Sequence, residues 1–267
     1  MLTFHKYTGA GNDFIMVNNL NGKINLDKDY IKFICDRHFG IGADGLILLE
    51  TSDKADCFMN YYNSDGTLAE MCGNGVRCVA KYFLKQTNRD LKELNIDTRA
   101  GIKKIIINKD DTYSVNMGMP VFKHTDFPSA ISPTYGQILK LEGFDFNCVS
   151  MGNPHAVTIV KDLNDIDIKN IGPKVEINSN FPNKINVEFV QKVSDDYFKV
   201  KVWERGCGAT LACGTGACAV FSILNKKEKF NKEITLEFSG GKLYLSENNK
   251  GEIILRGTAE FVFKGEI

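Results

Sequence analysis

Two short stretches of this sequence place a cysteine directly before a glycine-rich turn. One is "CGNG" at residues 72–75 and the other is "CGTG" at residues 213–216. Apolar side chains follow each stretch at helical spacing, over residues 76–84 and 217–224, so each cysteine is expected at the N-terminus of a helix. Free backbone N–H groups and the positive end of the helix dipole stabilise a thiolate there. The positions therefore predict thiols whose pKa falls toward neutrality and which can act as a base.

The glycines beside these cysteines have a related use. They lack side chains, so a substrate can approach the helix-terminal N–H groups, which form a binding site for a carboxylate. No lysine follows either turn, as a phosphate-binding P-loop would require. Two thiols facing one carbon could remove a proton from one face and return one to the other. The residues thus favour a racemisation or epimerisation, and the alternative is that both cysteines pack as small apolar side chains.

A repeat relates the two cysteine motifs. Cys72 maps onto Cys213 at an offset of 141 residues, and the same offset places "GN" at 11–12 on "GN" at 152–153. Because two motifs share one ungapped register, the chain is predicted to contain an internal duplication. The expected domains are residues 1–118 with Cys72 and residues 119–258 with Cys213. The strand-like segment 259–267 is expected to return to the first domain, and turn residues at 118–128 mark the boundary.

Most of the remaining chain resembles short strands, with alternating or β-branched patterns in "KIIIN", "AVTIV", "YFKVKVWE", "EITLEF", "KLYLSE" and "EIILRG". Helical patterns are scarcer. The helix after Cys213 has few polar residues and is expected to be buried. The predicted class is α/β (α+β), with two pseudo-symmetric domains.

Composition narrows the classes of function. Among 267 residues, 33 basic and 33 acidic side chains cancel, so neither nucleic acid nor an anionic membrane surface is an expected partner. The sequence shows no signal peptide and no apolar run that could span a bilayer, which predicts a cytoplasmic protein with its eight cysteines reduced. No C-x-x-C pair is present, so no metal site is expected. No lysine lies in a recognisable pyridoxal phosphate site, and no cofactor is expected.

The motifs together resemble the diaminopimelate epimerase family over essentially the whole chain. They are, in order, "KYTGAGNDF", "RHFGIGADG", "YYNSDGTLAEMCGNGVRC", "SMGNPHAV", "NVEFV" and "WERGCGATLACGTGACA". The resemblance implies two similar domains, each a mixed sheet curled into a barrel around a central helix, with the active site between them. It also implies a small-molecule amino-acid substrate, no cofactor and a homodimer.

The resemblance further implies the roles of individual residues in converting LL- to meso-2,6-diaminopimelate, a step toward lysine and peptidoglycan precursors. Cys72 and Cys213 would be the acid/base pair. The α-carboxylate would be held by Gly73, Asn74, Gly214 and Thr215. The substrate's other groups would be held by Asn12, Asn63, Asn153, Asn186, Glu204 and Arg205. His155 and Glu204 would tune the pKa of a nearby thiol.

One departure and several alternatives stay open. Some family members carry Gln where this chain has Gly45, which leaves recognition of the distal end of the substrate less defined. "GIGADG" matches a dinucleotide-binding pattern, but a strand-like segment follows it instead of a helix. A related racemase acting on histidine, proline or hydroxyproline is the nearest rival, although proline racemases typically have M-C-G-H-G where this chain has "MCGNG". A phenazine-type isomerase should lack the cysteine pair, and a dithiol redox sensor is the non-enzymatic alternative.

Overall fold

A computed structural model describes residues 1–122 and 138–267. These residues form two compact units. Unit 1 contains Met1–Asn116 and Arg256–Ile267, and unit 2 contains Met117–Leu255. The sequence placed the boundary between residues 118 and 119, and part of the turn-rich segment expected there lies outside the described residues.

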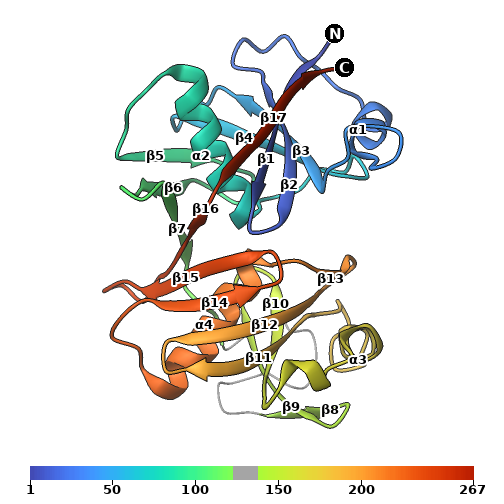
Figure 1. The fold of residues 1–267 in the computed structure, drawn as a ribbon, viewed down its shortest axis with the longest axis vertical. Coiled ribbons are helices and arrows are strands. Elements are labelled where there is room, and N and C mark those ends of the chain that lie inside the picture. The colour runs from blue at the N-terminus through green and yellow to red at the C-terminus, as the bar shows by residue number, and fades with distance from the viewer. Residues whose placement is uncertain (123–137) are drawn as a thin grey trace. The chain divides into compact units, whose positions relative to one another are not determined.

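Unit 1 is a mixed sheet with two helices. Along the chain its elements are β1 (Thr3–Gly9), β2 (Asn12–Asn18), α1 (Lys28–Cys35), β3 (Gly45–Glu50), β4 (Cys57–Asn63), α2 (Gly73–Thr87), β5 (Glu93–Asp97), β6 (Lys103–Ile107), β7 (Thr112–Gly118) and β17 (Glu260–Glu266). β1 pairs antiparallel with both β2 and β17, so the C-terminal strand completes this unit. The order continues through β3, parallel to β2, then β4, β5, β6 and β7 (Figure 1).

Helix α2 occupies the inside of this sheet. It contacts β1, β2, β3, β4 and β5, which is possible because the sheet curls around it. Its apolar stripe is buried, including Val76, Val79 and Phe83. On the outer face, Ile31 and Ile34 of α1 join a second apolar cluster with Ile15. The central strands are thus buried on both faces, as their near-continuous apolar sequences require.

Unit 2 repeats this architecture. Its elements are β8 (Leu139–Leu141), β9 (Phe144–Ser150), β10 (Pro154–Val160), a 3₁₀ turn (Leu163–Asp165), α3 (Ile168–Glu176), β11 (Asn186–Ser194), β12 (Tyr197–Glu204), β13 (Gly208–Thr210), α4 (Gly214–Glu228), β14 (Ile234–Phe238), β15 (Gly241–Glu247) and β16 (Ile253–Thr258). β9 and β10 are antiparallel, β10 and β11 are parallel, and β11 and β12 are antiparallel. β14 runs parallel to β12 and antiparallel to β15.

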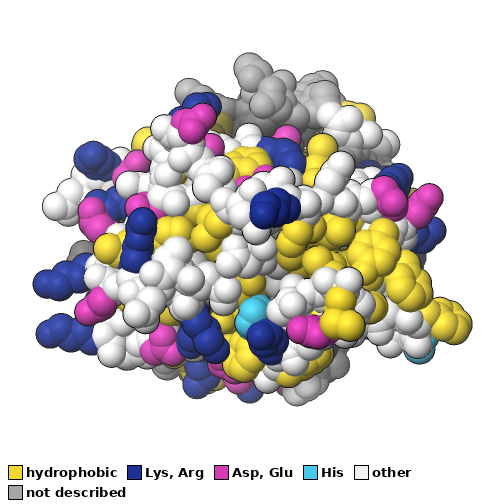
Figure 2. Space-filling view, turned by 90° about the horizontal axis from the view of Figure 1, so that it is seen from above, with side chains coloured by type: hydrophobic (Ala, Val, Ile, Leu, Met, Phe, Trp, Pro, Cys, Tyr) yellow, Lys and Arg dark blue, Asp and Glu magenta, His cyan; other side chains and the backbone are white. Residues whose placement is uncertain are grey.

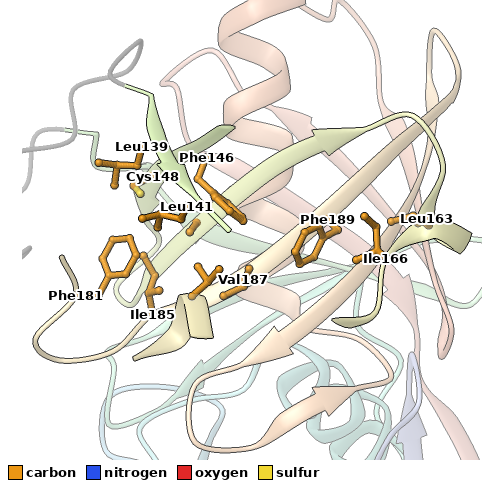
Figure 3. Close-up of a cluster of buried hydrophobic side chains, with 12 residues drawn as sticks. Leu139, Leu141, Phe146, Cys148, Leu163, Ile166, Phe181, Ile185, Val187 and Phe189 are labelled. Carbon is orange, nitrogen blue, oxygen red and sulfur yellow. The ribbon is translucent and has the colours of Figure 1, made fainter. Parts of the chain in front are cut away.

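Two helices pack against this sheet as well. Helix α4 contacts β9, β10, β11 and β15. The eight residues from Ala217 to Leu224 are all buried, and so are Gly214 and Gly216 before them. On the other face, α3 contributes to an apolar cluster that includes Phe146, Val187 and Phe189, whose rings and branches point toward one another in Figure 3. The prediction that the helix after Cys213 is buried is therefore confirmed.

The duplication is visible element by element at the offset of 141 residues. Helix α2 starts at Gly73 and α4 at Gly214, and both contain 15 residues. Strand β1 starts at Thr3 and β9 at Phe144, and both end at positions 141 residues apart, Gly9 and Ser150. Even the parallel register is the same, because Phe14 opposes Gly45 as His155 opposes Asn186. The predicted fold class, two pseudo-symmetric halves of mixed curled sheet around a helix, is confirmed.

Candidate active site

Cys72 is the N-cap of α2 in unit 1. Its backbone is extended, with φ −135° and ψ 122°, and its Sγ accepts a hydrogen bond from the Gly75 N–H at 3.5 Å. The sulfur thus does what a serine or aspartate side chain usually does at this position, which is to satisfy one of the free N–H groups of the first turn. The predicted thiol at a helix N-terminus is present.

A buried arginine forms hydrogen bonds with the first turn of α2. Arg77 is fully buried and donates to the Gly73 carbonyl at 3.2 Å, to Asn74 Oδ1 at 2.9 Å and to the Thr258 carbonyl at 3.1 Å. Since the guanidinium fixes the Asn74 oxygen, the Asn74 amide nitrogen is turned toward Asn12 Oδ1, 2.5 Å away. The predicted residues Asn12, Gly73 and Asn74 therefore lie together beside Cys72.

A charged network supports Asn12 on its other side. Its Nδ2 donates to Asp44, which shares the Arg37 guanidinium with Asp13. Asp13 also forms an ion pair with the buried Lys6 at 2.8 Å. Burial works against ionisation of Asp13, but hydrogen bonds from Arg37 and Lys6 outweigh it and lower its pKa to about 2. Asn12 is thus oriented by Asp44, which is held in place by the same arginine as Asp13.

The two remaining predicted positions of unit 1 are less closely joined to this group. Asn63 directs its amide to the Thr67 hydroxyl at 3.0 Å and stabilises the turn after β4. At Gly45, a Cβ would lie 2.4 Å from the Tyr62 carbonyl and 2.6 Å from the Tyr61 ring. A glutamine side chain therefore has no room there, because the Tyr61 ring fills the space.

Cys213 caps α4 in the same way as Cys72 caps α2. Its Sγ accepts from the Gly216 N–H at 3.4 Å and lies 3.4 Å from the Thr215 hydroxyl. Its surroundings differ, because the thiol is buried and carboxylates at Glu204 and Glu188 face it. Burial, followed by the charge of the Glu204 carboxylate, raises the pKa of Cys213 well above its usual value. The expectation that the helix terminus lowers this pKa is wrong for Cys213, because burial and the Glu204 carboxylate outweigh the helix dipole and the Thr215 hydrogen bond.

A chain of hydrogen bonds leads away from this thiol. Asn153 Nδ2 donates to Thr215 Oγ1 at 3.2 Å, and Asn153 Oδ1 lies 3.0 Å from His155 Nε2. The Asn153 to Thr215 link corresponds to the Asn12 to Asn74 link of unit 1 at the same offset. His155 Nε2 is thus connected to Cys213 through Asn153 and Thr215, and its other nitrogen, Nδ1, lies 2.7 Å from Glu188 Oε1. Two residues, Asn153 and Thr215, therefore separate His155 from the thiol that it was expected to tune, whereas Glu204 faces that thiol directly.

The turn that carries Glu204 and Arg205 is fastened at two points. Asn186 Oδ1 accepts from the Arg205 backbone N–H at 2.9 Å, so these two predicted residues are joined. Glu176, at the end of α3, accepts from Trp203 Nε1 at 2.7 Å and from the Gly206 N–H at 3.0 Å. Glu204 itself accepts from the Thr210 hydroxyl at 2.5 Å. The turn after β12 is thereby held in place beside the N-terminus of α4.

Sequence reasoning missed Arg77, Glu176 and Glu188. A signal for two of them was available, since Arg77 interrupts the apolar stripe of its helix and Glu188 interrupts the apolar run "NVEFV". Glu176 offered none, because its partner Trp203 comes from a strand far along the chain. Within the described residues, no group of three metal-ligating side chains is found, and no helix is long and apolar enough to cross a membrane.

The two equivalent glycines Gly75 and Gly216 should respond differently to a methyl group. A Cβ at Gly216 would lie 2.6 Å from the buried Glu188 Oε1, whereas at Gly75 it would meet the flexible end of Met59 at 3.0 Å. We expect Gly216→Ala to destabilise the protein by about 1–3 kcal/mol, as overpacking usually does. Gly75→Ala is the matched control and should be close to neutral in thermal unfolding. Equal melting temperatures for the two variants would contradict the close packing of Glu188 on α4.

The carboxylate of Glu204 should hold the Cys213 thiol in its protonated form. Because its charge raises the pKa of Cys213, Glu204→Gln should shift the pH dependence of Cys213 alkylation to lower pH. The rate can be followed by mass spectrometry of the peptide carrying Cys213. Glu142→Gln, in the β8–β9 turn, serves as the control. An unchanged profile in Glu204→Gln would show that this carboxylate does not act on the thiol.

Comparison with known sequences places these features in a family. Residues 4–123 and 147–262 match the family described as diaminopimelate epimerase. The chain is 42% identical over 275 residues to the diaminopimelate epimerase of Methanococcus maripaludis strain C5, covering all of this chain and 99% of that protein. It is 44% identical over 271 residues to the diaminopimelate epimerase of Carboxydothermus hydrogenoformans, covering 99% of each.

Comparison with solved structures agrees on the fold. A phenazine biosynthesis protein of the PhzF family from Bacillus anthracis superposes with a TM-score of 0.73 at 18% identity, over all of this chain and 98% of that one. At this identity the similarity shows the fold alone. The full-length match in sequence is decisive, and the chain belongs to the diaminopimelate epimerase family.

Proposed function

We propose that this protein interconverts LL- and meso-2,6-diaminopimelate with Cys72 and Cys213 as a two-base pair. The observation that carries the proposal is the repeated cap: each cysteine sulfur accepts an N–H group at the N-terminus of a buried helix, and a glycine directly follows each cysteine. Family membership supplies the substrate class.

The proposed reaction balances in protons. A thiolate takes the α-hydrogen as a proton and becomes a thiol, which leaves a planar carbanion conjugated with the α-carboxylate. The second thiol gives its proton to the opposite face of the carbon and becomes a thiolate. Configuration is inverted, and the enzyme is left with the two protonation states exchanged.

The α-carboxylate is proposed to bind the first-turn N–H groups of Gly73, Asn74, Gly214 and Thr215. Negative charge grows on this carboxylate as the α-proton leaves, so donors fixed in advance stabilise the carbanion more than the substrate. Arg77 supports this role in unit 1, because it adds a buried positive charge to the same turn.

The remaining predicted residues are proposed to hold the other groups of the substrate. Asn12 and Asn153 lie next to the two first turns, while Asn186 fixes the backbone at Arg205. The Arg205 guanidinium can fork onto a carboxylate, and Glu204 and the Asn63 amide oxygen can accept from an ammonium group.

The two thiols are proposed to start from different protonation states. Cys213 rests as the thiol, because its burial and the charge of the Glu204 carboxylate raise its pKa. It is therefore the acid in the first step, and Cys72 is the base. The substrate whose α-hydrogen faces Cys72 is the one that the resting enzyme accepts.

The experiment is solvent exchange without added cofactor. In deuterium oxide and under reducing conditions, LL-diaminopimelate should lose its α-hydrogen to solvent while meso product forms. Histidine, proline and trans-4-hydroxyproline in the same assay separate the related racemases. If diaminopimelate shows neither exchange nor inversion, the substrate assignment fails.

Single-cysteine variants test the two-base mechanism in the same assay. Cys72→Ala and Cys213→Ala should each lower the inversion rate by at least about a hundredfold, the usual contribution of a general acid or base. Cys207→Ala is the matched control, since Cys207 is exposed and lies close to Glu204 in sequence. Two active single variants would refute the mechanism.

We also propose that the protein works as a homodimer in the cytoplasm. Support for the dimer comes from β17, where Phe261, Val262 and Phe263 are 39%, 53% and 44% exposed. Figure 2 shows hydrophobic side chains gathered on one side of the face that it presents, with charges of both signs over the rest.

Light scattering tests the dimer. Wild type should have twice the mass of one chain, and Val262→Asp should have the mass of one chain. Val193→Asp, at an exposed position of β11, should stay dimeric. A wild-type mass of a single chain would contradict the proposal.

A further inference from the structure

A carboxyl and an imidazole lie in the core of unit 2 where unit 1 has apolar side chains. Glu188 in β11 and His155 in β10 are fully buried, and Nδ1 of the histidine lies 2.7 Å from Glu188 Oε1. At the offset of 141 residues their counterparts are Ile47 and Phe14, which are fully buried too. Because unit 1 folds around Ile47 and Phe14, the polar pair is not a requirement of this architecture.

The hydrogen-bond chain fixes where one proton of this pair must lie. Asn153 Nδ2 donates to Thr215, so its Oδ1 faces His155 Nε2 and accepts from it. His155 therefore carries a proton on Nε2. A single further proton lies between His155 Nδ1 and Glu188 Oε1, and the pair is neutral overall wherever that proton resides.

The surroundings of Glu188 favour the proton on the carboxyl. Its second oxygen, Oε2, is buried and has no hydrogen-bond partner among the described residues. An ionised carboxylate with an unpartnered oxygen is costly in a site without water. The groups that face it are His155 from β10, Cys148 from β9, Glu204 from β12 and Cys213 at the start of α4. Of these only His155 can be positive, and Glu204 is acidic.

We propose that Glu188 is a positioning residue that remains a neutral carboxylic acid and holds His155 as its Nε2–H tautomer. That tautomer fixes the Asn153 amide, whose N–H occupies one lone pair of the Thr215 hydroxyl oxygen. The hydroxyl proton is then free to point at the Cys213 sulfur, 3.4 Å away. The catalytic consequence rests on the proposed function, since the Thr215 hydroxyl stabilises Cys213 when it has given up its proton.

Nitrogen-15 NMR of the substrate-free protein tests the tautomer directly. The chain has only four histidines, so the His155 signals can be assigned by their loss in His155→Gln. At neutral pH we expect one protonated nitrogen, Nε2, and one unprotonated nitrogen, Nδ1. Protonation of both nitrogens would mean that Glu188 is ionised and would overturn the proposal.

Two substitutions at Glu188 separate positioning from simple packing. The amide of Glu188→Gln can donate to His155 Nδ1 as the acid does, so the tautomer should persist and kcat should stay within about threefold of wild type. Glu188→Ile introduces the side chain of the unit 1 counterpart and removes the donor. Its His155 signals should report both tautomers, and kcat should fall about tenfold, as for one lost hydrogen bond.

Melting temperatures show whether Glu188→Ile folds. If it does not fold, the wild-type spectrum and Glu188→Gln still test the proposal. If Glu188→Gln loses as much activity as Glu188→Ile, the neutral-acid assignment is wrong. An inactive wild type with the expected tautomer would reject the proposed function but not the tautomer assignment. An active wild type with a doubly protonated His155 would support the proposed function and reject the role of Glu188.

Discussion

The capping of a buried helix by a cysteine sulfur is the interaction on which this structure depends. In each unit the Sγ atom accepts the N–H three residues ahead, at Gly75 or Gly216, and so closes the first turn of a helix enclosed by a curled sheet. Sulfur is a weak acceptor, and the first-turn N–H groups that lack an intrahelical partner are those proposed to bind the substrate carboxylate. A glycine is needed at position 216 because a side chain there would collide with the buried Glu188. Structural capping and proposed chemistry therefore use the same atoms.

The two units contain equivalent copies of this arrangement, but the charged residues around the two cysteines differ. Unit 1 places the Arg77 guanidinium behind its first turn, where unit 2 has the buried Cys218. Unit 2 places carboxyl groups around its thiol, at Glu188 and Glu204, where unit 1 has Ile47 and Asn63. A two-base reaction needs one proton donor and one acceptor at the start, and a buried cation on one side with acids on the other favours that difference.

The sequence was sufficient for the parts that follow from local pattern and repetition. The motif Cys-Gly-x-Gly before an apolar stripe correctly predicted both buried helices. The shared register at 141 residues predicted the internal duplication, and the structure shows it in matching strand pairs, Phe14 with Gly45 and His155 with Asn186. Strand patterns such as "YFKVKVWE" were correct because alternation reflects two differently packed faces.

The pKa of Cys213 and the packing around Gly45 could not be predicted in the same way. A helix terminus alone indicates a lowered thiol pKa, but the pKa of Cys213 depends on how deeply it is buried and on Glu204 from strand β12. Likewise, nothing local shows that the Tyr61 ring leaves no room for a side chain at Gly45. These properties come from packing between segments distant in the chain, which a single sequence does not specify.

The central proposal is that the reacting carboxylate binds the first-turn N–H groups of both capped helices. A crystal structure of the Cys72→Ala/Cys213→Ala variant soaked with LL-diaminopimelate tests it most directly. The account predicts that one α-carboxylate accepts hydrogen bonds from the N–H groups of residues 73–74 and 214–215. A diaminopimelate bound with both carboxylates away from these N–H groups would contradict it.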